Sequence, residues 1–189
     1  ISHFLNADEL TRRILKERGF ATYAVAPPEI LQQSNLIAAE KVFSEVRRLL
    51  AAGEAVAVET VLSTDKYRAV VENLRRDGGI FNLIYIGLRS WELSRERVSI
   101  RVAKGGHPVP EEKLATRWER SLDRLPWFAS RADHFYIFDN SDSDLNHKPI
   151  LIAREGSSPG SLRLLNRRAN PSIVEALLAS KLFNPVTGE

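Results

Sequence analysis

The sequence predicts an α/β fold with a mainly parallel sheet flanked by helices. Short apolar runs of strand length alternate with segments whose apolar residues recur every three or four positions, and this alternation is typical of parallel sheets with helical crossovers. The runs mostly lack polar alternation, which favours strands buried on both faces. A chain of 189 residues corresponds to one domain, residues 1–189, at roughly 150 residues per domain.

Four apolar runs are the predicted strands, and a fifth opens the chain. The four cover Ala55–Val58 continuing to Leu62, Phe81–Leu88, His134–Phe138 and Ile150–Ala153. The opening run Ile1–Leu5 is shorter, but like the others it precedes a helical segment.

Helical segments lie between these runs. The clearest has Leu36, Ala39, Phe43, Val46 and Leu50 at helical intervals before Gly53 ends it. Further helices are expected at 65–77, 91–103 and 110–124, the last two joined by a loop rich in glycine and proline. After about Gly156 the composition predicts only loose organisation.

Composition excludes several classes of protein. The chain is 43% hydrophobic and 27% charged, as in ordinary globular proteins. No run approaches the roughly 18 apolar residues of a membrane span, and the start lacks a signal-peptide pattern, so a cytoplasmic location is expected. The chain has no cysteine, which excludes disulfides, Cys-ligated zinc and a thiol nucleophile. It also has no methionine, which predicts that residues precede Ile1 in the natural protein.

The positive charge is concentrated in one segment. Residues 94–124 hold eight lysines and arginines against five acids, so this segment carries the whole net charge of +3. A net charge this small does not predict a nucleic-acid partner, and the tryptophans do not lie on a basic strand face.

Polar residues end three of the apolar runs, where ligands of parallel sheets gather. They are Asn6 to Glu9, then Glu59 with Thr60, then Asp139 to Ser141. Each set has a structural alternative: Asn6 or Asp8 can cap the following helix, and Asp139 can belong to an ordinary turn. Glu59 is the most suggestive, because burying a carboxylate in so apolar a strand is costly without a partner.

The basic segment has the composition of a lid over a polyanion. Arg97 and Arg101 share a helix face, and no acid lies three or four residues from Arg97 or Arg101; Arg117 is on the next helix. Arginine binds phosphate through bidentate hydrogen bonds. The alternative is two solvated helix faces. Acids at strand ends together with arginines on a glycine-hinged hairpin favour phosphoryl transfer, in which a carboxylate takes a hydroxyl proton and cations hold the phosphates.

Four segments resemble, in order and spacing, the zeta-toxin-like P-loop kinases: FLNADEL, AVETVLSTDKYR, LIYIGLRSWELSRERVSIRVAKGGHPVPEEKLATRWERSL and FDNS, spanning about residues 4–141. The resemblance implies a P-loop kinase-like fold with an arginine-rich helical hairpin as lid. It implies a kinase that uses ATP and Mg²⁺ to phosphorylate a sugar hydroxyl of a nucleotide sugar such as UDP-N-acetylglucosamine. An antitoxin protein is a further partner that the family suggests.

The resemblance also implies roles for individual residues. Asp8 takes the place of the catalytic base, and Glu59 with Thr60 that of the substrate-binding residues. The phosphate-contacting position falls on Arg97, with Arg101 and Arg117 as its companions. No Mg²⁺ ligand is implied for any residue of this sequence.

One family motif is missing. The phosphate-binding string GxxxxGK[ST] does not occur in the 189 residues, and its strand, loop and helix, about 30 residues, are expected before Ile1.

Two alternative functions stay open. One is a P-loop kinase or ATPase for another acceptor, such as an antibiotic, a nucleoside or a protein. The other is a non-catalytic toxin-like module that binds a protein partner.

Overall fold

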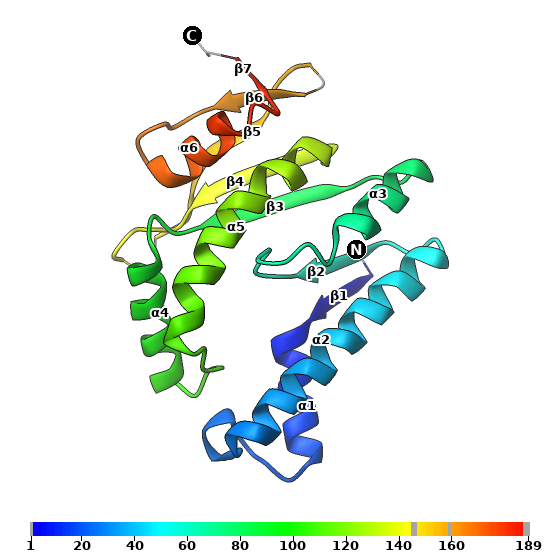
Figure 1. Cartoon of the computed structure of the whole chain (residues 1–189), viewed down its shortest axis with the longest axis vertical. Helices are drawn as coiled ribbons and strands as arrows, with labels where there is room; N and C mark the ends of the chain where they lie inside the picture. The colour runs from blue at the N-terminus through cyan, green and yellow to red at the C-terminus, as the bar shows by residue number, and fades with distance from the viewer. Residues whose placement is uncertain (1, 145–146, 159, 187–189) are drawn as a thin grey trace. The chain divides into compact units, whose positions relative to one another are not determined.

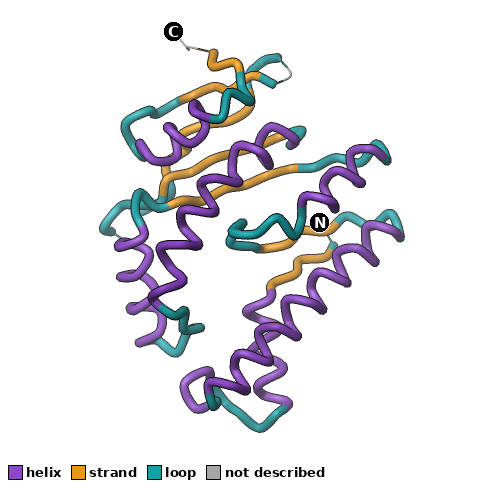
Figure 2. Tube along the Cα trace, viewed as in Figure 1, coloured by secondary structure: helices purple, strands orange, loops and turns teal. Residues whose placement is uncertain are grey.

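The computed structural model describes residues 2–144, 147–158 and 160–186, and its mixture of helices and strands confirms an α/β architecture (Figure 2). The chain forms two compact units. Unit 1 comprises Ile1–Val61 and Arg97–Val109, and unit 2 comprises Leu62–Glu96 and Pro110–Glu189. Ile1, which the opening strand was predicted to include, lies outside the described residues. A single domain stays a prediction.

Unit 1 contains a small parallel sheet and two long helices (Figure 1). β1 (His3–Asn6) pairs with β2 (Val56–Glu59), and the register sets Asn6 opposite Glu59 at the carboxyl ends of both strands. α1 (Ala7–Glu17) follows β1 directly, and the short 3-10 helix η1 (Tyr23–Val25) leads to α2 (Pro28–Ala51). α1 and α2 pack against each other.

The buried face of α2 differs from the one that the sequence indicated. Its buried residues are Ser34, Ala38, Val42, Val46 and Leu49, whereas Leu36 is 59% exposed. The helix itself is confirmed. Small side chains at the start of this stripe allow close approach of α1, whose Ile14 and Leu15 are buried, so helix packing rather than hydrophobicity alone selects the face.

Unit 2 is built on a five-stranded mixed sheet in the order β3-β4-β5-β6-β7. The strands are β3 (Asn82–Gly87), β4 (His134–Asp139), β5 (Ile150–Glu155), β6 (Ser161–Leu164) and β7 (Asn184–Val186). β3 with β4 and β6 with β7 are parallel, but β5 runs antiparallel to both neighbours. The expectation of a mainly parallel sheet is wrong for β5, because residues 140–149 are too few for the dozen or more that a parallel crossover needs.

The helices of unit 2 cover one face of its sheet. They are α3 (Arg68–Arg76), α5 (Glu111–Arg131) and α6 (Pro171–Ala179), while α4 (Trp91–Ala103) begins in unit 2 and passes into unit 1 at Arg97. The core joins α5, α6 and the sheet through buried residues that include Leu125, Ile137, Ile152, Leu162 and Leu177. No helix in the described part of the chain has the length and apolar character of a membrane span.

Two predictions about the strands are corrected. The strands are not buried on both faces: Ile84 is 68% and Ile86 57% exposed, while Leu83 and Tyr85, which alternate with them, pack on the core. The second strand ends at Glu59 and does not continue to Leu62. Leu62 has a left-handed backbone (φ 60°) and is buried against Val71 and Phe128.

Two further predictions are corrected, one about the end of α5 and one about the chain after Gly156. α5 extends beyond residue 124 to Arg131 and passes through Pro126; burial of Leu125, Phe128 and Ala129 around the proline holds a helix that proline would otherwise break. The prediction of a loosely organised tail is wrong, because β6, α6 and β7 all follow Gly156. Short elements between turn-rich segments lack a long apolar pattern, so composition hides them.

Candidate active site

Asn6 connects the end of β1 to the start of α1. Its side-chain oxygen accepts hydrogen bonds from the backbone N–H of Asp8 at 2.8 Å and of Glu9 at 3.1 Å. Asn6 is therefore the N-cap, and Asp8 is a first-turn residue with an exposed side chain. Because Asn6 satisfies the end of the helix, the carboxylate of Asp8 is not needed as a cap.

The same asparagine also contacts the neighbouring strand end. Its amide nitrogen donates to Oε2 of Glu59 at 2.6 Å. Glu59 is exposed, so the expectation of a costly buried carboxylate is wrong: as the last residue of β2, it reaches solvent at the strand end. Asn6 thus uses both ends of its amide to hold Glu59 beside the turn that carries Asp8.

Tyr23 lies next to this turn, although no sequence pattern points to it. Its hydroxyl donates to the backbone carbonyl of Asp8 at 2.7 Å. Burial raises the pKa of the Tyr23 phenol, the negative charge of Asp8 raises it further, and the positive charges of Arg12 and Arg101 lower it. The Asp8 carboxylate and the Arg101 guanidinium are therefore both within electrostatic range of one hydroxyl group.

Arg101 is held by the turn that ends α4. Its Nη2 donates to the carbonyl of His107 at 3.0 Å, and the N–H of Gly106 donates to the carbonyl of Arg101 at 2.9 Å. Arg97 is half-buried one turn earlier on the same helix. Within unit 1 the structure thus places Arg101 in the same neighbourhood as Asp8, and Arg97 on the helix that carries Arg101.

The two remaining predicted site residues, Thr60 and Arg117, are located here by the elements that carry them. Thr60 is exposed and follows β2 directly. Arg117 is half-buried on α5 in unit 2, and its role stays a prediction. At the start of α5, Glu111 pairs with Arg95 of α4 at 2.8 Å, so part of the basic segment is neutralised by an acid 16 residues away in sequence.

The third strand end, at Asp139, is a buried polar network in unit 2. Oδ1 of Asp139 accepts hydrogen bonds from the hydroxyl of Ser141 at 2.5 Å and from the amide of Asn170 at 2.8 Å. Asp139 is 6% exposed and Asn170 fully buried. Asp139 is the last residue of β4, and its carboxylate has a structural role in this network.

This network fixes the chain that leads into α4. The N–H of Arg89 donates to the hydroxyl of Ser141 at 2.8 Å, and its guanidinium donates to the Ser141 carbonyl at 2.9 Å. The carbonyl of Leu88 accepts from the indole of Trp118 at 2.9 Å. The start of the helix that carries Arg97 and Arg101 is thus anchored on the ends of β3 and β4.

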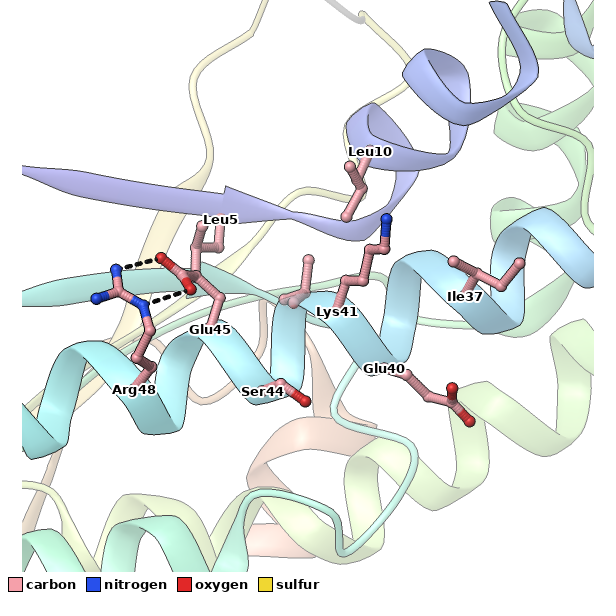
Figure 3. Close-up of a pocket in the computed structure, with 9 residues that line it drawn as sticks. Leu5, Leu10, Ile37, Glu40, Lys41, Ser44, Glu45 and Arg48 are labelled. Carbon is pink, nitrogen blue, oxygen red and sulfur yellow. Dashed lines mark hydrogen bonds and ion pairs between the residues drawn. The ribbon is translucent and has the colours of Figure 1, made fainter. Parts of the chain in front are cut away.

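Unit 1 also has an open groove of about 790 Å³ between β1, α1 and α2 (Figure 3). Its apolar wall includes Leu5, Leu10 and Ile37. On its polar side, Glu45 and Arg48 form a two-bond ion pair along α2, with distances of 2.6 and 2.8 Å. None of the predicted site residues lines this groove, and its charges balance, so its composition favours no particular ligand.

The arrangement in unit 1 suits acid–base chemistry on a polar substrate. An exposed carboxylate at Asp8, a second one held at Glu59 and a guanidinium at Arg101 can accept a proton, bind a hydroxyl group and bind an anion, respectively. The described residues include no group of three or more His, Asp or Glu side chains arranged for a metal ion.

Comparison with known proteins finds no match: no family model, no curated protein and no solved structure is significantly similar to this chain.

Proposed function

We propose that this chain carries the acceptor-side residues of an ATP-dependent kinase that phosphorylates a hydroxyl group of a small molecule. The sequence resemblance to zeta-toxin-like kinases suggests the acceptor class, a sugar hydroxyl of a nucleotide sugar such as UDP-N-acetylglucosamine. The observation that supports the proposal most is the hydrogen bond from Asn6 to Glu59 at 2.6 Å, next to the helix turn that carries Asp8.

In the proposed reaction Asp8 is the general base. Its carboxylate accepts the proton of the acceptor hydroxyl while that oxygen attacks the γ-phosphorus of ATP, and ADP leaves with the electron pair of the broken P–O bond. The carboxylate is exposed and its helix turn is already capped by Asn6, so it can contact a substrate without loss of structure.

The other residues bind the reactants. Glu59 accepts hydrogen bonds from further hydroxyl groups of the acceptor, and Thr60 adds a short polar contact beside it. Arg97 and Arg101 neutralise the phosphate oxygens, where fixed positive charge stabilises the transition state. Arg117 joins them by resemblance alone. Because the 189 residues contain no GxxxxGK[ST] string, we assign no residue to such a loop.

The test uses the protein expressed from its complete coding sequence. It is incubated with ATP, Mg²⁺ and a panel of acceptors that includes UDP-N-acetylglucosamine, nucleosides and aminoglycosides, and mass spectrometry detects the added phosphate. We expect transfer to one acceptor class. Asp8→Asn should lower kcat by about 10²- to 10⁴-fold, the usual contribution of a general base.

Glu9→Gln is the matched control. Glu9 is the next residue of the same turn, its N–H donates to the same Asn6 oxygen, and its side chain pairs only with Arg12 on the exposed surface among the contacts described. Its amide variant should retain wild-type activity. Equal activity of the Asp8 and Glu9 variants would remove Asp8 from its role, and transfer to no acceptor would instead favour a non-catalytic binding module.

A further inference from the structure

The side chain of Tyr23, in the short helix η1, links the turn after α4 to the first helix of unit 1. Its hydroxyl donates to the Asp8 carbonyl at 2.7 Å. The same ring meets the imidazole of His107 edge-on, with ring centroids 4.9 Å apart and an interplanar angle of 82°. Tyr23 therefore joins two segments that are 99 residues apart in sequence, Asp8 and His107.

The turn that contains His107 is closed on itself. The carbonyl of His107 accepts from Arg101 at 3.0 Å, and the N–H groups of Lys104 and Gly106 both donate to the Arg101 carbonyl. A β-carbon on Gly106 would lie 2.5 Å from Cγ of Arg101, so the arginine stem packs directly on the turn. Whatever restrains His107 therefore also restrains Arg101.

We propose that Tyr23 is a positioning residue that holds the 101–107 turn against the first turn of α1, and so sets the Arg101 guanidinium relative to the Asp8 carboxylate. The catalytic half of this inference rests on the proposed function, and the structural half does not. Edge-to-face ring contacts and one hydrogen bond are each modest interactions, so loss of the Tyr23 contacts should lower activity by a modest factor and not abolish it.

The phenol is suited to this role across the physiological range. Burial, then the Asp8 charge, raise its pKa, so the hydroxyl keeps its proton and remains a donor. The Asp8 carbonyl is a backbone group. Substitution of the Asp8 side chain therefore removes the proposed base but leaves the contact with Tyr23 in place.

The structural half is tested by hydrogen–deuterium exchange on the complete protein. Tyr23→Phe removes the hydroxyl and keeps the ring, and His107→Gln removes the ring contact from the other side. In both variants we expect amide exchange in residues 101–109 to rise by about three- to tenfold, as the loss of one such interaction allows. Asp8→Asn and the control Tyr136→Phe, a half-exposed tyrosine on β4 in unit 2, should exchange as the wild type does.

The catalytic half is tested by kinetics on whichever acceptor of the panel described under Proposed function receives the phosphate. Tyr23→Phe should lower kcat by a similar three- to tenfold factor and leave KM for the acceptor within about twofold, because Asp8 and Glu59 do not move. Wild-type exchange in both the Tyr23 and His107 variants would overturn the contact. Faster exchange with unchanged kcat would overturn the positioning role, and an inactive wild type would refute the proposed function while the exchange result still decides the contact. If Tyr23→Phe fails to fold, His107→Gln carries both measurements.

Discussion

The amide of Asn6 lies 2.6 Å from the carboxylate of Glu59, at the paired ends of two parallel strands. The same side chain accepts the first N–H groups of α1. One residue therefore couples the stability of a helix to the orientation of a carboxylate, and the two functions can be separated by substitution.

Asn6→Asp keeps the side-chain oxygen that caps α1 but loses the donor to Glu59 and places a second negative charge beside it. Asn6→Ala loses both interactions. We expect Asn6→Ala to lower the free energy of unfolding by about 1 kcal/mol, the usual value of an N-cap, and Asn6→Asp to lower it by less. Both should lower kcat/KM for the acceptor. Urea denaturation with the transfer assay checks this, and an alanine variant as stable as the wild type would contradict the cap assignment.

Gly105 and Gly106 are required for different reasons. Gly105 has φ 83° with open space around it, so Gly105→Ala should cost about 1 kcal/mol of stability through the backbone alone. A β-carbon on Gly106 would lie 2.9 Å from the Arg101 carbonyl oxygen, so Gly106→Ala must displace that arginine. We expect Gly106→Ala to reduce turnover more than Gly105→Ala does. The reverse order of kcat values would refute the close packing of Arg101 on the turn.

Asn170 stabilises the buried network of unit 2. It donates to Asp139 and accepts the N–H of Ile173 at the start of α6. Asn170→Ala removes both bonds and leaves a buried carboxylate less satisfied, so the free energy of unfolding should fall by about 2 kcal/mol or more. Ser180→Ala, which removes a half-buried hydroxyl bond at the other end of α6, is the control, with a smaller loss. Equal losses in urea denaturation would refute the network's importance.

Glu155 makes the stability of unit 2 depend on pH. Burial opposes ionisation, but hydrogen bonds from the Phe135 N–H at 3.0 Å and from His134 outweigh it, so the pKa of Glu155 is lowered on folding. A lowered folded-state pKa gives stability above the ordinary glutamate range, near 4.3, that is lost as the pH falls through the folded value. The difference in unfolding free energy between wild type and Glu155→Gln should therefore shrink from pH 7 to pH 3. A constant difference across that series would exclude the ionised carboxylate as its source.

Much of the fold follows from local pattern, and the exceptions have physical causes. The helix at 91–103 is found with the predicted bounds, because local spacing and the glycines after it determine both ends. The direction of β5 could not be read from its own residues, since the length of the preceding connection decides it. The shifted face of α2 depends on which neighbour packs there, and a single helix carries no such information.

Part of the candidate site could likewise be predicted from the sequence, and part could not. Asn6, Asp8 and Glu59 stand out in the sequence because polar residues end apolar runs, and parallel pairing brings Asn6 and Glu59 together. The exposure of Glu59 could not be foreseen, because the strand ends at Glu59 whereas the predicted strand continues to Leu62. Tyr23 carries no pattern at all: a tyrosine in a short connection acquires its role only when the loop at His107 folds against it.

A double-mutant cycle on Asp8 and Arg101 tests most directly whether these residues act in one reaction centre. The assay is kcat/KM for phosphate transfer in the complete protein carrying Asp8→Asn, Arg101→Gln or both, with Arg13→Gln on the exposed side of α1 as the charge-matched control for Arg101. Groups that stabilise the same transition state are strongly non-additive, so we predict that the double variant loses little more than the worse single variant. Losses that multiply would contradict the account.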